Sequence, residues 1–267
     1  TRSYSLMGDC RQRGRYEIAV LREPTGRGGS EAMHRDCQVG SILHCNPPVN
    51  HFELVEHATN YILIAGGIGI TPIRTMAIEL QRRGAPFMLH YATRTADETV
   101  LKQDIADQFG ANVMFWHSID GARLDVQAVM SGISTGGAVY VCGPASLIQA
   151  AIDALDPLGL PRSILHFETF TAAAPNTSDH AFEVVLKRSA QTVRVRPDQT
   201  ILDAVLAAGI DAPFGCRAGE CGVCAVGVLG GEPDHPDTVL DESNRAVPGH
   251  LCICFSRARN GSLVIDL

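Results

Sequence analysis

The chain has 267 residues, of which 45% are hydrophobic and 19% charged, and its formal net charge is −7. This composition is typical of a folded protein of two or three domains and excludes a disordered chain. The acidic balance argues against nucleic acid as the main partner, and every apolar run is too short to span a membrane. Because the sequence has no signal-peptide pattern, we expect a soluble, cytoplasmic protein.

Three segments follow one another along the chain. Residues 1–52 are rich in Arg and Gly and are expected to form strands and loops, whereas residues 53–170 alternate strand and helix patterns. Residues 171–179 have the composition of a linker. Residues 180–267 return to short strands around one helix. We therefore expect a multidomain protein.

The middle segment has the clearest pattern. Apolar strands are expected at residues 61–65, 87–92, 112–117 and 138–142. Helices are expected from near Pro72, which suits a first helical turn, and near residues 97–109, 124–131 and 144–155. Strands that alternate with helices in this way predict a parallel sheet covered on both faces.

The last segment predicts a small α+β unit. Its one helix is expected at residues 201–208, where Thr200 can cap the start and Gly209 can end it. Short strands are expected at residues 181–187, 192–196, 223–229, 251–255 and 263–265.

A cysteine-rich loop follows this helix. Cys216, Cys221 and Cys224 have the spacing Cys-x4-Cys-x2-Cys, which together with a later cysteine is typical of a plant-type [2Fe-2S] cluster. A structural zinc site is the alternative, but such sites prefer two Cys-x2-Cys pairs and this loop has one. Cys252 and Cys254 lie at alternate positions of an expected strand and would face the same side. The spacing favours Cys254 as the fourth ligand.

The cluster loop and the end of the chain carry a family resemblance. Residues 180–267 resemble a plant-type ferredoxin domain with a β-grasp fold, and the stretch from Cys254 to Leu267 resembles reductases of the phthalate dioxygenase reductase and vanillate demethylase reductase type. In that family a flavin domain, a nicotinamide domain and a ferredoxin share one chain. The resemblance implies a partial antiparallel β-barrel for flavin in residues 1–52 and an α/β nicotinamide-nucleotide domain in residues 53–170.

The glycine-rich turn after the first apolar strand predicts a nucleotide site. Backbone N–H groups and the helix dipole at such a turn favour a pyrophosphate, although a tight turn without a ligand is the alternative. Two stretches resemble the nicotinamide motifs of ferredoxin-reductase-like proteins: Gly66-Gly67-Ile68-Gly69-Ile70-Thr71-Pro72 and Val141-Cys142-Gly143-Pro144. The resemblance implies that Thr71 lies near the nicotinamide or its phosphates and that Cys142 lies beside the hydride-bearing carbon. A buried core cysteine is the alternative for Cys142.

The choice between NADH and NADPH turns on the loop after the second strand. Arg94 could hold a 2′-phosphate, whereas Asp97 or Glu98 could accept a hydrogen bond from a ribose hydroxyl or open a helix. The resemblance implies NADH.

The same resemblance covers His166 to Phe170, where Phe170 would shield the flavin face and Glu168 would lie near the nicotinamide; a strand edge packed with aromatic rings is the alternative.

The first segment carries two flavin motifs by the same resemblance. In the Arg-x-Tyr-Ser motif, Arg2 would pair with the flavin phosphate, Tyr4 would stack on the isoalloxazine and Ser5 would hydrogen-bond its N5. The second motif resembles a phosphate site of FMN-binding members, with FAD less expected, and a hairpin loop is the alternative. It comprises Gly26, Arg27, Gly28, Gly29 and Ser30.

The segment before the nucleotide domain is about half as long as the family's flavin barrel requires. We therefore expect that the first strands of the barrel are absent, either because the chain is a fragment or because the first part was not included; a true fragment should retain flavin weakly.

The order of the domains predicts a reductase component. NADH would deliver hydride to FMN, and single electrons would pass to the [2Fe-2S] cluster and then to a Rieske-type oxygenase. One alternative is a ferredoxin-type electron carrier with a truncated, inactive reductase part; another is an FAD-containing monooxygenase reductase. Acidic residues between the cluster loop and Cys252 could steer a basic partner, although a solvated loop is favoured. They are Glu232, Asp234, Asp237, Asp241 and Glu242.

Overall fold

A computed structural model describes residues 3–9, 11–24, 28–50, 52–170, 180–214, 219, 222–234 and 249–267. The chain divides into two compact units, Thr1–Phe170 and Thr171–Leu267. The division into a flavin, a nucleotide and a ferredoxin domain stays a prediction, because the first two would both lie in the first unit.

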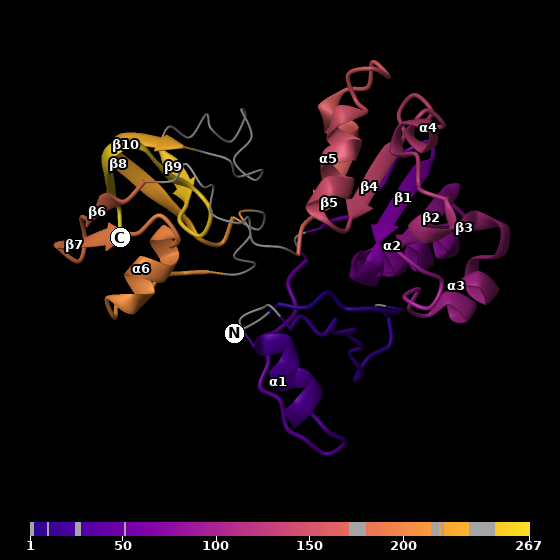
Figure 1. The fold of residues 1–267 in the computed structure, drawn as a ribbon, viewed down its shortest axis with the longest axis horizontal. Coiled ribbons are helices and arrows are strands. Elements are labelled where there is room, and N and C mark those ends of the chain that lie inside the picture. Colours follow the sequence, from indigo (N-terminus) through magenta and orange to yellow (C-terminus); the bar gives the residue numbers. More distant parts are fainter. Residues whose placement is uncertain are drawn as a thin grey trace. The chain divides into compact units, whose positions relative to one another are not determined.

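The first unit is built on a parallel sheet of five strands (Figure 1). Its spatial order is β3-β2-β1-β4-β5. The strands are β1 Tyr61–Gly66, β2 Phe87–Thr93, β3 Val113–His117, β4 Ala138–Cys142 and β5 Leu165–Glu168. The predicted α/β parallel sheet is confirmed, and β5 adds an edge strand that the apolar runs did not indicate.

Four helices cover the two faces of this sheet (Figure 1). They are α2 Ile70–Arg83, α3 Lys102–Phe109, α4 Val126–Met130 and α5 Ala145–Asp153. Successive side chains of a strand point to opposite faces, so β1 contributes to two cores. Tyr61 and Leu63 pack in a core with α2 and α3, whereas Ile62 and Ile64 pack in another with α4 and α5.

Short 3-10 turns complete the part of this unit that carries the parallel sheet. They are η1 Gly67–Gly69, η2 Gly110–Asn112, η3 Ser118–Asp120 and η4 Arg162–Ile164. The helix expected at residues 97–109 begins only at Lys102, because Leu101 adopts a left-handed conformation with φ of 58°. Asp97 and Glu98 therefore lie in a turn before the helix, and the alternative that they open the helix is wrong.

The N-terminal segment forms little regular structure within its described residues. One antiparallel bridge joins Met7 to Glu17, and helix α1 spans Gly29–Asp36, where strands and loops were expected. The segment is tied to the sheet through α2, since the Thr75 hydroxyl donates to the carbonyl of Leu6 at 2.9 Å.

The second unit is a mixed sheet of five strands with one helix, in the order β7-β6-β10-β8-β9. Strands β6 and β10 are parallel and the other neighbours antiparallel, as expected for a β-grasp ferredoxin. The elements are β6 Phe182–Leu186, β7 Gln191–Val195, α6 Ile201–Ala207, β8 Ala225–Asp234, β9 His250–Cys252 and β10 Arg257–Ile265.

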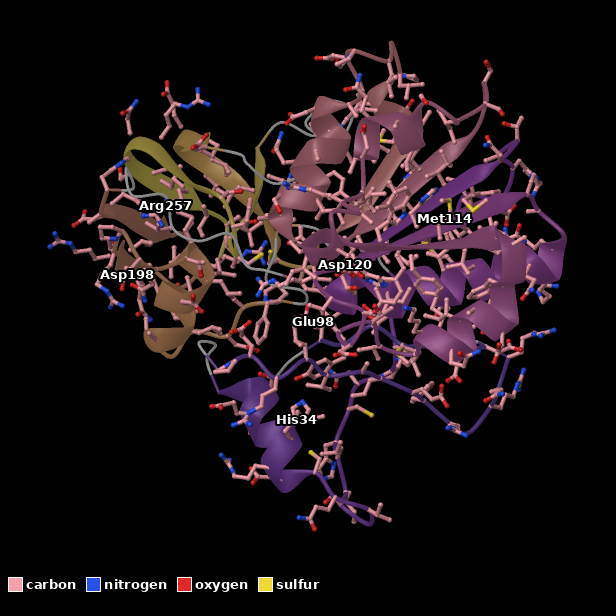
Figure 2. All side chains as sticks on the ribbon, turned by 45° about the vertical axis from the view of Figure 1, so that its right-hand side comes forward. His34, Glu98, Met114, Asp120, Asp198 and Arg257 are labelled. Carbon is pink, nitrogen blue, oxygen red and sulfur yellow. The ribbon has the colours of Figure 1, made fainter. Side chains whose placement is uncertain are left out.

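Two polar side chains fix the ends of elements in this unit. Thr200 caps α6, because its hydroxyl accepts a hydrogen bond from the N–H of Asp203 at 3.0 Å, as predicted. Arg257, labelled in Figure 2, donates to the carbonyls of Gln199 and His180 and holds the loops on either side of β6 and β7. Among the described residues, no helix is both long and apolar enough to cross a membrane.

Candidate functional site

The carboxyl ends of three neighbouring strands meet at one edge of the parallel sheet. In the register, Ala65 on β1 is opposite Cys142 on β4, and Cys142 is opposite Glu168 on β5. The chain order reverses between β1 and β4, because β2 and β3 lie on one side and β5 on the other. Ligands of open α/β sheets bind outside such a reversal point. The sheet therefore brings together the two predicted nicotinamide motifs and the predicted Glu168.

The glycine-rich turn after β1 packs tightly against the turn after β4. A Cβ atom at Gly69 would lie 2.1 Å from the carbonyl oxygen of Cys142, and one at Gly143 would lie 2.9 Å from the Cα of Gly66. Only glycine fits at these close approaches. A Cβ at Gly67 would meet nothing within 4 Å, so this position faces open space. The turn thus has one packed side and one open side.

The open side presents the start of helix α2. The N-cap of α2 is Gly69, which has no side chain that could cap the first N–H groups of the helix. The hydroxyl of Thr71 donates to the carbonyl of Ile68 at 3.0 Å, and Thr71 and Pro72 are both buried. Thr71 therefore shapes the turn, and the backbone N–H groups are the donors that fit a pyrophosphate.

The predicted redox residues lie at the same edge. Cys142 is fully buried at the end of β4, and Glu168 is half-buried at the end of β5. The hydroxyl of Ser5 donates to Oε2 of Glu168 at 3.2 Å, although the two residues are 163 positions apart. Phe170, two residues beyond, is 43% exposed, which leaves its ring accessible for a flat ligand. One hydrogen bond therefore joins the flavin motif to the nucleotide motifs.

The second flavin motif forms the start of helix α1. Gly28 occupies the N-cap in a left-handed conformation with φ of 75°, and Gly29 and Ser30 begin the helix. The Ser30 hydroxyl accepts a hydrogen bond from the N–H of Glu23 at 3.0 Å. A helix start with small residues fits a phosphate group. Tyr4 is half-buried beside Ser5, whereas Arg2 and Arg27 lie outside the described residues.

The loops that follow β2 and β3 form the candidate ribose site. The N–H of Ile119 donates to the carbonyl of Arg94 at 3.1 Å and brings the two loops together. Arg94, Asp97 and Glu98 are all exposed in the first loop. The second loop supplies Asp120, which Figure 2 labels together with Glu98. Cationic and anionic side chains both remain available here.

A polar network at the ends of β2 and β3 was missed by sequence reasoning. The Thr93 hydroxyl contacts the Thr99 hydroxyl at 2.9 Å and Nδ1 of His117 at 3.0 Å, and Nζ of Lys102 lies 3.4 Å from Nε2 of His117. These contacts join the ends of β2 and β3 to the turn and the helix start that follow β2. The available signal was their position, because polar residues that directly follow buried strands gather at one sheet edge.

The described part of the cluster site contains buried thiols in contact. Sγ of Cys224 lies 3.1 Å from Sγ of Cys254, and both residues are almost completely buried. Cys254 lies beyond the end of β9 in a turn, so the strand expected to reach Phe255 stops at Cys252. Cys216 and Cys221 lie outside the described residues.

The environment of Cys224 suits a thiolate. Hydrogen bonds from Cys252 and from Cys254 hold the pKa of the Cys224 thiol well below its usual value. The described cysteines form no disulfide. Buried thiols with a stabilised anionic form fit the ligands of an iron-sulfur cluster, which binds through thiolates.

Comparison with known proteins extends these observations to the whole chain. The model of the 2Fe-2S iron-sulfur cluster binding domain matches residues 184–259. The "Phenoxybenzoate dioxygenase subunit beta" of Ectopseudomonas oleovorans is 40% identical over 100% of this chain and 83% of its own length. The "Vanillate O-demethylase oxidoreductase" of Pseudomonas sp. (strain HR199 / DSM 7063) is 38% identical over 100% of this chain and 85% of its own length.

A solved structure agrees with these relatives. Phthalate dioxygenase reductase, described as a modular structure for electron transfer from pyridine nucleotides to [2Fe-2S], is 34% identical, with a TM-score of 0.73. The match covers 100% of this chain and 83% of that protein. The parallel sheet and the mixed sheet found here, together with the cluster-binding domain, agree with the predicted family. The chain therefore belongs to the phthalate dioxygenase reductase family of flavin, pyridine-nucleotide and [2Fe-2S] oxidoreductases.

Proposed function

We propose that this chain is the cytoplasmic reductase component of a Rieske-type oxygenase system, which moves electrons from NADH through FMN and a [2Fe-2S] cluster to the oxygenase. The hydrogen bond between Ser5 and Glu168 carries the proposal, because it links the flavin motif to the edge where Cys142 and the glycine-rich turn meet. When bound, the flavin converts a two-electron hydride donor into a source of single electrons for the cluster.

The side chains of this chain bind and orient the reactants. The N–H groups at the start of α2 would hold the pyrophosphate, and the packing of Gly69 on Cys142 would fix the depth at which the nicotinamide enters. The carboxylate of Glu168 accepts a hydrogen bond from the Ser5 hydroxyl and so orients the Ser5 oxygen. The exposed ring of Phe170 would cover the flavin face and exclude water.

The choice of FMN rests on the start of α1. Gly28, Gly29 and Ser30 offer a short cradle of backbone N–H groups that suits one terminal phosphate. NADH is favoured by the family, while the candidate ribose site presents charges of both signs. The flavin released by acid separates the two flavins, because FMN and FAD differ in chromatographic mobility; FAD would favour a monooxygenase reductase of another type.

The proposed partner is an oxygenase, as the name "Phenoxybenzoate dioxygenase subunit beta" indicates for that relative. Glu232 and Asp234 at the end of β8 are exposed, and Asp234 lies 3.8 Å from Arg259. The other acidic residues of this stretch lie outside the described residues. Neutralising Glu232 should leave the salt dependence of electron transfer nearly unchanged if the stretch is only solvated, and should weaken it if the stretch steers a partner.

Anaerobic addition of NADH to the purified protein tests the proposal. We expect bleaching of the flavin absorbance, followed by the low-temperature EPR signal of a reduced [2Fe-2S] cluster, with NADPH slower than NADH. A cluster that dithionite reduces but neither nucleotide reduces, in a sample shown to contain flavin, would contradict the proposal. That outcome would favour the electron-carrier alternative.

A further inference from the structure

A polar cavity of about 480 Å³ lies between the N-terminal segment and helix α2, and its volume is within the range of small-molecule sites. One wall comes from the loop that the bridge between Met7 and Glu17 closes, and the other from α2 and α3. Each wall contributes two arginines: Arg11 and Arg15, and Arg74 and Arg82. No residue that lines the cavity belongs to the flavin, nucleotide or cysteine motifs, so the cavity is separate from the candidate functional site.

Three of the four arginines are paired with carboxylates. The pairs are Arg11 with Asp9, Arg15 with Glu17, and Arg82 with Glu79. These pairs balance the charges at the edges of the cavity without a ligand.

Arg74 is the arginine of this cavity that has no acidic partner among the described residues. Its Nη2 donates to Oε1 of Gln108 at 3.3 Å, which is a neutral acceptor. Its Nε is buried and has no hydrogen-bond partner in the described part of the chain. A half-buried cation with an unused donor costs free energy, and an unpartnered buried donor in a folded protein is often explained by a bound ion or water. Arg74 therefore lacks an anion that the protein itself does not supply.

The arrangement of the donors indicates which anion fits. Side-chain N–H groups line both walls, because the amides of Gln12 on one side and of Gln81 and Gln108 on the other accompany the arginines. A carboxylate has two oxygens in one plane, whereas a phosphate has a tetrahedral set that can accept from opposite walls. The planar fork of an arginine also matches a phosphate through two parallel hydrogen bonds. The cavity has room for more than the phosphate alone.

We propose that this cavity binds the phosphate group of a small phosphorylated molecule, and that Arg74 is its main ligand. The site goes beyond the proposed electron transfer and does not depend on it. A bound phosphate would join the loop after Met7 to α2, beside the hydrogen bond that Thr75 already donates to the carbonyl of Leu6. Binding should therefore fasten the N-terminal segment to the parallel-sheet part of its unit.

Calorimetric titration of the full chain tests the site. Saturating FMN and NAD⁺ are present so that the proposed cofactor sites are filled, and the ionic strength is held constant because salt screens exposed charges. The ligands are inorganic phosphate, glucose 6-phosphate and the dicarboxylate succinate. The variants are Arg74→Gln and Arg74→Lys. Arg83→Gln is the matched control, since Arg83 is on the same helix, pairs with Glu79 at 2.7 Å and does not line the cavity.

We expect one phosphate per chain, with glucose 6-phosphate bound more tightly because it fills more of the cavity. Equal affinities for the two would identify free phosphate as the ligand. Arg74→Gln should weaken binding by about tenfold to a hundredfold. Arg74→Lys should be intermediate, because it keeps the charge but loses the fork. Arg83→Gln should bind like the unsubstituted protein. Hydrogen exchange of residues 7–17 should slow when phosphate binds to the unsubstituted protein but not to Arg74→Gln.

Three results would overturn the proposal. They are no binding at millimolar concentrations, the same affinity in Arg74→Gln as in the unsubstituted protein, and tighter binding of succinate than of either phosphate. Equal urea midpoints of Arg74→Gln and Arg74→Lys without ligand show that a loss of binding is not a loss of folding. Because the titration involves no electron transfer, failure of NADH to reduce the flavin would reject the proposed function and leave this inference intact.

Discussion

The hydroxyl of Ser5 and the carboxylate of Glu168 form the contact on which the candidate site depends. Substituting either residue by alanine removes the bond, so we predict that Ser5→Ala and Glu168→Ala each slow flavin reduction by NADH, by up to about a hundredfold. Because the two side chains act through one hydrogen bond, the double variant should be little slower than the slower single variant. Stopped-flow absorbance of the flavin measures all three rates.

A matched control for this pair is Ser131→Ala. The Ser131 hydroxyl donates to the carbonyl of Ala128 at the end of α4. Its rate should equal that of the unsubstituted protein. If the losses in Ser5→Ala and Glu168→Ala multiply in the double variant, the two residues act independently and the shared bond has no role.

A second residue predicts how stability depends on pH. His90 on β2 is 7% exposed, and its Nδ1 accepts a hydrogen bond from the indole of Trp116 at 3.2 Å. Burial lowers the pKa of His90 from 6.5 to about 4. Between pH 6.5 and pH 4, His90 is therefore protonated in the unfolded chain but neutral in the folded chain. The free energy of unfolding falls as the pH drops through this range. Between pH 7 and pH 5 the loss should be about 2 kcal/mol.

Urea unfolding measures this loss through the fluorescence of Trp116, the one tryptophan of the chain. In His90→Gln the new side chain can still accept a hydrogen bond from the indole of Trp116 but does not titrate. The variant's free energy of unfolding should therefore fall by about 2 kcal/mol less than that of the unsubstituted protein over the same pH range. His57→Gln, at an exposed histidine, is the control and should behave like the unsubstituted protein. His166, whose pKa burial also lowers, is present in every variant. Equal slopes for His90→Gln and the unsubstituted protein would contradict the assignment.

At the scale of elements, local sequence patterns predicted the helices and strands whose positions follow from buried apolar side chains alone. Strand β4 spans the predicted residues 138–142, because five successive buried side chains give a clear apolar run. Helix α1 was missed because it buries none of its residues and so shows no apolar face. Helix α3 starts late because Leu101 adopts a left-handed conformation, in a turn where Thr93 and Thr99 also hydrogen-bond to each other. Such contacts are not visible in a local pattern.

The candidate site divides in the same way. The spacing of the cysteines predicted a [2Fe-2S] cluster. The place of the glycine-rich turn between a strand and a helix predicted a nucleotide site. The bond between Ser5 and Glu168 could not be predicted by spacing, since it depends on how distant segments pack. The contact between the sulfurs of Cys224 and Cys254 depends on the turn after β9, which begins earlier than the apolar pattern indicated.

The turn between β1 and α2 gives an element-scale prediction. A Cβ at Gly69 would overlap the carbonyl of Cys142, so Gly69→Ala must push β1 and β4 apart at their carboxyl ends. We expect the free energy of unfolding to fall by more than about 2 kcal/mol. We also expect the variant to lose flavin reduction by the nucleotide. Gly132→Ala, where the nearest atom to the new Cβ lies at 3.4 Å, should be close to neutral. Urea unfolding followed by Trp116 fluorescence gives the midpoints of both variants. Equal midpoints would show that the turn accommodates the Cβ atom at residue 69 without loss of stability.

At the scale of the whole molecule, each unit has its own core. One buried cluster lies entirely between Phe182 and Ile265, and the other two lie between Tyr61 and Leu165. The cores share no residue, so each unit can bury its apolar surface without the other. Residues 180–267 expressed alone should therefore fold and assemble the [2Fe-2S] cluster, as visible absorbance and EPR would report.

Separation should change the kinetics of the electron path. In the intact chain the two units share one polypeptide, so reduction of the cluster by NADH should proceed at a rate independent of protein concentration. With residues 180–267 added to a separate chain of residues 1–170, the same step becomes an encounter between molecules, and its rate should rise in proportion to concentration. Stopped-flow absorbance over a tenfold dilution distinguishes the two cases. The comparison requires flavin in both samples, measured after acid release. A concentration-dependent rate in the intact chain would mean that electrons pass between molecules, and that joining the units serves another purpose, such as delivering both to one partner.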